Sequence, residues 1–304
     1  PAPRPDAPLR PAVLQFGYAG FAAFAREHAA TGRVSVNLGD CMQTLAARAA
    51  WERLGVDPAS VVAIDRDALP AYDGPPVALI MNACFYRHCF PLPPQVRPVF
   101  FGFQAKRRHI RHARRLLRAH APIGCRDPAT AAHCAAEGIE AHVTGCLTLS
   151  FPPRETAPDP GAVLLVEGTG AGAFPEAALA TLPPAMAARL ERVSQRQDVT
   201  RLPLPRQDRD SLEATAAALL ARYRREAGHV VTPLHHAAAP CLASGIPVTI
   251  CRTGPSDRFG FLETLLPVHV APDFAAIDWA AAPPDLAPLR AREHATLAAM
   301  IAPL

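Results

Sequence analysis

The chain has 304 residues, of which 50% are apolar and 19% charged, so it can bury a core and is not wholly disordered. Its apolar runs, such as residues 77–81, are far shorter than the roughly 18 residues of a membrane span. Residues 1–150 carry a net charge of +6 and residues 151–304 one of −2, so an anionic ligand is expected on the first half. Because the chain opens without an apolar signal segment, we expect a cytoplasmic protein.

The cysteines give no sign of a metal centre. The eight cysteines include no CxxC pair and form no closely spaced quartet with histidine. Zinc sites depend on such spacings, and disulfides are rare in the cytosol. We therefore expect free cysteines, no metal and no resident cofactor.

In the first half, short apolar runs rich in β-forming residues alternate with segments of helical length. This alternation predicts a mostly parallel sheet covered by helices. The expected strands span residues 33–36, 61–64, 77–81, 99–102, 123–125 and 141–143, and the expected helices span residues 41–54, 106–119 and 128–137.

Residues 151–160 are rich in proline and lack periodicity, which indicates an interdomain linker. Beyond it, strands are expected at residues 162–166, 199–204, 229–232 and 248–251, with helices near 177–193 and at 210–226, 234–244 and 286–300. We therefore predict an α/β protein with two Rossmann-like domains of parallel sheet, residues 1–150 and 161–284, and a C-terminal helix within residues 285–304. Such folds bind ligands at the carboxyl ends of their strands, so the site is expected in a cleft between the domains.

Residues 36–43 place Asn37, Gly39 and Asp40 between a predicted strand and a predicted helix. Asp40 can be explained as a helix N-cap, which accepts backbone N–H bonds and contributes ~1 kcal/mol. In a second interpretation, Asn37, the Gly39 backbone and Asp40 lie at the lip of the cleft, because strand-to-helix turns face it. The pattern leaves both interpretations open.

Residues 122–130 predict a strand that leads into Asp127 as an N-cap and Pro128 as the first helical residue. Arg126 is thereby fixed at the carboxyl end of the strand, beside a helix N-terminus. A guanidinium and free backbone N–H groups can together hold a phosphate or a carboxylate. The alternative is a solvated side chain.

Residues 230–236 repeat this arrangement, with Thr232 as the expected cap and Pro233 in the first turn. One of His235 and His236 is expected to point into the cleft, while the other packs or faces water. A helix N-terminus disfavours imidazolium, whereas a bound phosphate raises the imidazole pKa. His236 could therefore donate a proton or a hydrogen bond once an anion arrives, and the alternative is a surface histidine.

Two further segments have a chemical composition that calls for an explanation. Residues 167–173 carry the glycines of a phosphate loop but not its GxGxxG spacing or its Lys-Ser/Thr pair, so a flexible turn is expected. Residues 106–118 carry seven basic residues opposite the apolar Ile110, Ala113 and Leu117. They predict an amphipathic helix with a solvated basic face rather than a nucleic-acid site, because no aromatic residue adjoins them. A polyanionic glycan or a membrane-surface acceptor would explain the charge equally well.

Taken together, these segments resemble the polysaccharide pyruvyl transferase family. Their joint order carries the resemblance, since each piece is weak alone. The pieces follow family order over nearly the whole chain: residues 37–46, 64–66, 79–82, 122–127, 145–149, 230–232 with His236, 245–248 and 257–259.

The resemblance implies a two-domain, glycosyltransferase-B-like fold, with the acceptor on the basic N-terminal domain and the donor on the C-terminal one. It implies transfer of a pyruvyl group from phosphoenolpyruvate to two hydroxyls of a sugar-containing acceptor, which yields a cyclic ketal and phosphate. The expected partners are these two substrates and not nucleic acid. The basic segment would also explain peripheral contact with a lipid-linked acceptor.

By the same resemblance, Arg126 would grip the donor, Arg258 would neutralise its remaining charge, and His236 would contact the phosphate or act as the acid. Asp40 would serve as the base. Arginines can supply the electrostatic stabilisation, so the reaction demands no metal. The remaining candidates for substrate binding are Asn37, Gly39, Asp127 and His235.

The chain departs from the family pattern near the second-half histidines. The family reads Arg-Leu-His where this chain has Leu234, His235 and His236, so a donor-binding arginine is absent unless Arg252 or Arg258 replaces it. Two alternatives follow. One is a relative that binds an anion without catalysis or uses another donor, and the other is a nucleotide-sugar glycosyltransferase, for which the glycine-rich turn at 168–172 is the sign.

Overall fold

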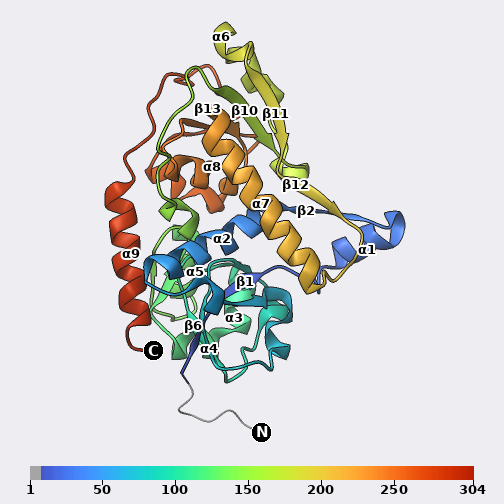
Figure 1. Ribbon diagram of the computed structural model, residues 1–304, viewed down its shortest axis with the longest axis vertical. Helices are drawn as coiled ribbons and strands as arrows, with labels where there is room; N and C mark the ends of the chain where they lie inside the picture. Colours follow the sequence, from blue (N-terminus) through green and yellow to red (C-terminus); the bar gives the residue numbers. More distant parts are fainter. Residues whose placement is uncertain (1–7) are drawn as a thin grey trace.

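The computed structural model describes residues 8–304 and has the predicted mixed α/β architecture (Figure 1). Two larger sheets are parallel throughout, with strand orders β3-β1-β4-β6 and β11-β10-β13-β14-β15. The first comes from the N-terminal half and the second from the C-terminal half. Their strands are β1 (Arg10–Gln15), β3 (Val62–Asp65), β4 (Val77–Ile80) and β6 (Val96–Val99), then β10 (Ala162–Glu167), β11 (Leu190–Ser194), β13 (Ala227–Thr232), β14 (Val248–Arg252) and β15 (Val268–Val270).

The helices that matter most for the site are α2 and α7, which pack against each other where the two halves meet, and α8, which packs on α2 (Figure 1). Helix α9 runs back along the N-terminal half, so that Met300 and Ile301 pack on its core. The α-helices of the described chain are α1 (Ala22–Thr31), α2 (Leu38–Arg53), α3 (Arg107–His112), α4 (Arg114–Ala119), α5 (Pro128–Ala135), α6 (Pro184–Ala187), α7 (Arg206–Glu226), α8 (His235–Ala243) and α9 (Ala287–Ile301).

Three small sheets lie outside the two larger ones. β8 (Ile123–Cys125) pairs with β9 (Ala141–Val143), and β5 (Cys84–Phe85) pairs with β7 (Gln104–Ala105), both in parallel. The third pairs β2 (Val34–Asn37) with β12 (Arg196–Val199) in antiparallel orientation. The prediction that the strand near residue 34 belongs to a parallel sheet is therefore wrong, because its partner comes from the other half of the chain.

The largest buried cluster reaches into both sheets, and two smaller clusters lie almost entirely in the C-terminal half. Fully apolar strands such as β4 are buried along their whole length, as expected for parallel strands covered on both faces. The largest buried cluster contains Leu14 of β1 and also Leu164 of β10. A polar contact reinforces this junction: Gln15 Nε2 donates to Asp210 at 2.8 Å and to Glu213 at 3.0 Å on α7. The halves therefore meet through apolar packing and a partly buried polar contact.

Several predicted elements differ from the structure. Strand β1, the centre of the first sheet, went unpredicted, and the strand expected at 99–102 lies at 96–99, because Gly102 turns the chain with φ +71°. The strand expected at 199–204 lies at 196–199, and the helices expected near 177–193 give way to short helical turns and β11. In that Ala-rich segment, prolines interrupt any long helix. Strands β8, β9 and β10 lie within a residue of their predicted positions, whereas α2 begins three residues and α7 four residues earlier than predicted.

The basic segment is helical but broken at Ala113, where α3 ends and α4 begins. Ile110, Ala113 and Leu117 are buried, so the predicted apolar stripe is confirmed. Of the helices within residues 8–304, none combines the length and apolar character that crossing a bilayer requires. All eight cysteines are free thiols, as predicted.

Candidate active site

A pocket of about 280 Å³ opens beside the start of α8, and both halves of the chain line it. β2 contributes Asn37, and the C-terminal half contributes the rest. The antiparallel β2–β12 pair brings these parts together. The other lining residues are Gly168, Thr169, Gly172, Gln195, Arg196, Pro233, Leu234, His235, His236, Arg252, Ser256, Arg258 and Phe259.

The wall of the pocket is cationic. It contains Arg196, Arg252 and Arg258, and no carboxylate is found among the described residues that line it. Arg252 is held in place, because its Nη1 donates to the Pro233 carbonyl at 2.7 Å and its guanidinium lies 4.4 Å from the centre of the Phe259 ring. A pocket of this charge selects an anionic ligand.

Both histidines of α8 are buried and both line the pocket. The expectations of one histidine pointing away, or of a surface histidine, are therefore wrong. Thr232 accepts from the Leu234 N–H at 3.0 Å and donates to the Val166 carbonyl at 2.6 Å. This contact orients the chain into a helix that begins at His235, two residues beyond Pro233. The whole first turn of α8 is thereby turned inward.

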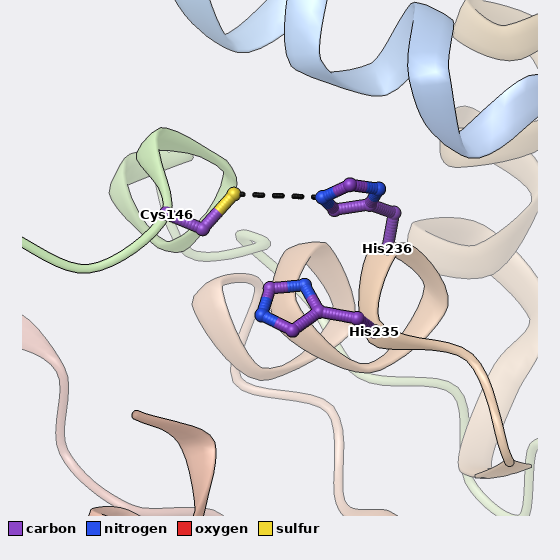
Figure 2. Close-up of side chains that lie close together, drawn as sticks. All are labelled: Cys146, His235 and His236. Atoms are coloured by element: carbon purple, nitrogen blue, oxygen red, sulfur yellow. Dashed lines mark hydrogen bonds between the residues drawn. The ribbon is translucent and has the colours of Figure 1, made fainter. Parts of the chain in front are cut away.

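Figure 2 shows the two imidazoles and the thiol of Cys146 grouped at the start of α8. His236 Nε2 lies 3.6 Å from Cys146 Sγ. Neither ring nitrogen of His235 has a hydrogen-bond partner among the described residues, although both are buried. Buried polar nitrogens without partners are costly in a folded protein. They indicate a ligand that would complete these contacts.

Burial lowers the pKa of His235 well below its ordinary value, and the charges of Arg126 and Arg258 lower it further. Burial lowers the pKa of His236 in the same way, with His235 and the two arginines as further causes. Both rings are therefore neutral near pH 7. An anion in the pocket would raise both pKa values again, because a negative charge stabilises the imidazolium form.

Cys146 lies in residues 145–149, one of the segments that carry the family resemblance, but the sequence predicts no role for its thiol. Gly145, at φ +84°, turns the chain into the short helix Leu147–Ser150, and Cys146 occupies the N-cap position with its side chain buried and making no cap hydrogen bond. Thr148 Oγ1 donates to Cys146 Sγ at 3.1 Å. Only the fold reveals that this thiol lies against His236, because 90 residues separate the two in sequence.

Arg126 is fully buried, with 0% of its surface exposed, so the alternative of a solvated side chain is wrong. Its Nη2 donates to Cys84 Sγ at 3.4 Å, and its Nε lies 3.8 Å from Asp127 Oδ2. Nε and Nη1 have no hydrogen-bond partner within the described part of the chain. The guanidinium is not part of the pocket wall, but its charge acts on both histidines that are.

The thiol of Cys84 links Arg126 to Arg258. Arg258 Nη2 donates to the same Sγ at 3.6 Å, although the two arginines come from different halves of the chain. Burial by itself would raise the pKa of Cys84, but the two guanidiniums outweigh it and the pKa is lowered. The two guanidiniums therefore contact the same sulfur atom, one from the pocket wall and one from outside it.

Asp40 lies in the first turn of α2, and the prediction that it caps this helix is wrong. Asn37 is the N-cap, since its Oδ1 accepts from the Gly39 N–H at 3.0 Å. Asp40 instead accepts from the Tyr18 hydroxyl at 3.1 Å and from Gln43 Nε2 at 3.3 Å. Burial raises the pKa of Asp40, and the charges of Arg66 and Arg258 offset part of the rise.

Gly39 and Asp127 do not line the pocket, but each helps to position a neighbouring helix of the site. A Cβ on Gly39 would lie 2.9 Å from His236 Cβ, so glycine is what allows α2 to approach α8 this closely. Asp127 is the predicted N-cap of α5, and its Oδ1 accepts from the Thr130 N–H at 2.8 Å. Among the described residues, its Oδ2 has no hydrogen-bond partner, and substrate contact by Asp127 stays a prediction.

The glycine-rich turn after β10 lines the pocket at Gly168, Thr169 and Gly172. A Cβ on Gly172 would lie 2.8 Å from Leu234 Cδ2. The turn is therefore packed against Leu234, at the position where an arginine was expected. Arg196 and Gln195 also line the pocket and went unpredicted, because they reach it only through the β2–β12 pairing.

Comparison with known proteins gives one match. The family model described as "Polysaccharide pyruvyl transferase" matches residues 85–255, which is more than half of the chain. The matched region includes Arg126, Cys146, His235 and His236, whereas Asn37, Asp40 and Arg258 lie outside it. No curated protein and no solved structure matches the sequence.

Proposed function

The chain belongs to the polysaccharide pyruvyl transferase family, and on this basis we propose that it transfers a pyruvyl group from phosphoenolpyruvate to two hydroxyls of a sugar-containing acceptor. One observation carries the proposal. Arg126 is completely buried and keeps two nitrogens without a hydrogen-bond partner in the described residues, next to a cationic pocket. Asp127 Oδ2 lies 3.8 Å from Nε, too far for a hydrogen bond, and buried donors without partners are costly, which favours an anion as the missing partner.

Phosphoenolpyruvate fits the charges available. It carries a phosphate and a carboxylate, and each needs cationic or N–H donors. Arg126 and Arg258 converge on Cys84 and can divide these two groups between them. Arg252, which is fixed by Pro233 and Phe259, offers the further cation that Leu234 does not supply.

The reaction balances without an oxidant or a further reactant. A proton adds to the methylene carbon of the donor, and the first sugar hydroxyl attacks the resulting cationic carbon. The C–O bond to phosphate then breaks, and the second hydroxyl closes the ketal. Of the two protons released by the hydroxyls, one balances the new methyl group and the other leaves on the phosphate. The chain must therefore supply an acid, a base and cations for the departing phosphate.

His236 and Asp40 are the proposed proton-transfer groups. The neutral His236 ring faces the pocket and gains basicity when a phosphate binds, so it can contact the phosphate or pass a proton to the donor. Asp40 has a raised pKa, which suits a base that must later release its proton. Four further residues are proposed to contact the substrates or to shape the site that binds them: Asn37, Gly39, Asp127 and His235.

We further propose that the two parallel sheets belong to domains of residues 1–150 and 161–284 in a glycosyltransferase-B-like arrangement, with residues 151–160 as the linker. The acceptor would bind on the basic N-terminal side and the donor on the C-terminal side, in the cytoplasm. The pocket lined from both halves supports this arrangement. No cofactor beyond the co-substrate is part of this proposal.

The experiment is a thermal shift followed by a phosphate assay. We expect millimolar phosphoenolpyruvate to raise the Tm of the intact protein and Arg126→Ala to abolish that rise. Arg206→Ala, on the exposed start of α7, is the matched control and should keep it. Phosphorus NMR with a panel of lipid-linked and nucleotide-linked sugars should then show release of phosphate with one acceptor class.

Each alternative gives a different result. Stabilisation by a nucleoside diphosphate but not by phosphoenolpyruvate would favour a nucleotide-sugar glycosyltransferase, for which Gly168 and Gly172 in the pocket wall are the supporting observation. Stabilisation by phosphoenolpyruvate without phosphate release from any acceptor would favour a relative that binds without catalysis. The absence of any shift with phosphoenolpyruvate would contradict the proposal itself.

A further inference from the structure

The cluster of Cys146, His235 and His236 is unusual because its donor atoms are mutually close and incompletely used. One ligand atom from each residue lies within 4.8 Å of the others, and all three residues are buried. They come from the short helix after Gly145 and from the first turn of α8, two segments that pack against each other (Figure 2). The site thus combines one sulfur and two imidazole nitrogens on rigid elements.

The distances approach those of a transition-metal site. Zn–S and Zn–N bonds of about 2.3 and 2.0 Å in a tetrahedral arrangement hold sulfur and nitrogen roughly 3.5 Å apart. His236 Nε2 and Cys146 Sγ are 3.6 Å apart. The ligand atom of His235 lies within 4.8 Å of the other two, and no hydrogen bond to another described residue hinders its ring nitrogens from moving closer.

A neighbouring contact also suits a thiolate ligand. Thr148 Oγ1 donates to Cys146 Sγ at 3.1 Å, and a donor of this kind orients and stabilises a metal-bound sulfur. The group of Asp67, His88 and Cys89 provides a contrast. Its carboxylate is already bonded to Arg66 and to His88, at 2.9 and 3.0 Å. The carboxylate and the imidazole of that second group are therefore already paired with each other and with Arg66.

We propose that Cys146, His235 and His236 bind a zinc-like divalent cation, with a fourth coordination position reached from the pocket. The donor set is the one that borderline-soft ions such as Zn²⁺ prefer, and three protein ligands with an open position are typical of zinc that contacts substrate. On binding, the Cys146 thiol loses its proton to solvent and the sulfur forms the bond to the ion.

Arg126 and Arg258 lie close enough to influence both histidines electrostatically, and their positive charges oppose a cation. The thiolate offsets one charge, and an anionic fourth ligand offsets more. Here the inference rests on the proposed function, since the phosphate of the donor is the anion that the pocket would supply. With the ion present, His236 would contact the phosphate through the metal, which is one of the two roles proposed for it above.

The test uses Co²⁺ as a spectroscopic probe on the purified full chain, without any substrate. We expect one Co²⁺ per chain, a thiolate-to-cobalt charge-transfer band, and displacement of the band by one equivalent of Zn²⁺. Cys146→Ser should abolish the band, and His235→Ala should weaken binding at least about tenfold. Cys251→Ser and His269→Ala, which change a buried cysteine and a histidine outside the cluster, should leave binding unchanged.

His235→Ala breaks no hydrogen bond to another described residue, so it keeps the test decisive if Cys146→Ser fails to fold. A missing band in the native protein, a band that survives Cys146→Ser, or unchanged affinity in His235→Ala would each overturn the proposal. Phosphoenolpyruvate thermal shifts, run with a chelator and with Zn²⁺, separate the two hypotheses. A Tm shift with phosphoenolpyruvate in a protein that binds no metal would contradict only the metal site. Metal binding without any Tm shift would contradict only the proposed donor.

Discussion

Arg66 and Arg126 are both buried guanidiniums, but their surroundings are opposite. Arg66 bonds Asp67 through Nε and Nη2 at 2.9 and 3.0 Å, and its Nη1 donates to the Cys84 carbonyl at 3.1 Å. Its guanidinium also lies 4.7 Å from the centre of the Phe16 ring. Arg126 has one sulfur contact at 3.4 Å and two nitrogens without hydrogen bonds to other described residues.

The difference in hydrogen-bond partners distinguishes an arginine that stabilises the fold from one that is suited to binding a ligand. A buried cation whose donors are all used holds the fold together, because each lost contact leaves another group unpaired. A buried cation with unused donors instead lowers the stability of the free protein and is retained for what it binds. The same reasoning applies to the nitrogens of His235 but not to Asp67, which is fully bonded.

The largest expected effect comes from substituting Arg66, whose guanidinium nitrogens all have hydrogen-bond partners. Arg66→Met leaves the buried carboxylate of Asp67 without its main partner, so we expect a loss of about 3–5 kcal/mol in the free energy of unfolding. Urea denaturation measures it. Arg206→Met, in an exposed pair on α7, is the control and should change stability by less than about 0.5 kcal/mol. Equal losses in both variants would refute the distinction.

Substituting Arg126, which keeps two guanidinium nitrogens without hydrogen-bond partners in the described residues, should affect stability less and activity more. Arg126→Met removes these two donors but also the ion pair with Asp127 at 3.8 Å, so we expect a smaller fall in Tm than in Arg66→Met. The same substitution removes a donor from the proposed phosphate site, and we expect phosphate release to fall by about 100- to 1000-fold. Thermal denaturation and a phosphate assay on the same preparation test both halves. A large drop in Tm would show that Arg126 is structural, like Arg66.

Glu293 on α9 is a further buried group without hydrogen-bond partners in the described residues, but unlike the two arginines it can become neutral, by binding a proton. Both carboxylate oxygens are buried without a hydrogen-bond partner in residues 8–304, and burial raises the pKa of Glu293 from 4.5 to about 8. The folded state therefore keeps a proton that the unfolded state loses. Stability should be full below pH 4.5 and decline as the pH rises towards 8.

Glu293→Gln keeps the shape of the side chain without its charge. At pH 9 we expect the variant to melt higher than the native protein by roughly 5 °C, with little difference at pH 5. Calorimetry at the two pH values checks this. Glu263→Gln, an exposed acid in the same half, should show no such pH-dependent gain. An unchanged pH profile in Glu293→Gln would place the titrating group elsewhere.

The smallest effect concerns the space beside His236. In Gly39→Ala the new Cβ would lie 2.6 Å from Gln195 Nε2 and 2.9 Å from His236 Cβ, so we expect a loss of about 1–3 kcal/mol and a weaker phosphoenolpyruvate shift. Gly254→Ala is the control, because its Cβ would meet nothing within 4 Å. Denaturation and ligand-induced Tm shifts measure the two effects. Equal behaviour would mean that α2 can move away from α8 freely.

Local patterns predicted some of the site. The Asp127-Pro128 pair fixed the start of α5, and with it the place of Arg126 at the end of β8. The β13-to-α8 turn placed both histidines at a helix start within one residue. The prediction for α5 succeeded because capping and proline geometry act over a few neighbouring residues. The prediction that Thr232 caps α8 with Pro233 in its first turn is wrong, since Leu234 is the N-cap and the helix begins at His235. The N-cap interpretation of Asp40 is wrong, since Asn37 occupies that position.

The sequence by itself determined the α/β class, the family and the parallel strands, because apolar periodicity, helix caps and motif order are written in consecutive residues. Only the tertiary structure decided that Arg126 is buried with unused donors, that Cys146 meets His236, and that Arg196 reaches the pocket. These facts depend on β2 pairing with β12 and on α8 packing against the segment after Gly145. Burial and charge are properties of the assembled neighbours, and no local pattern specifies which distant residues those neighbours are.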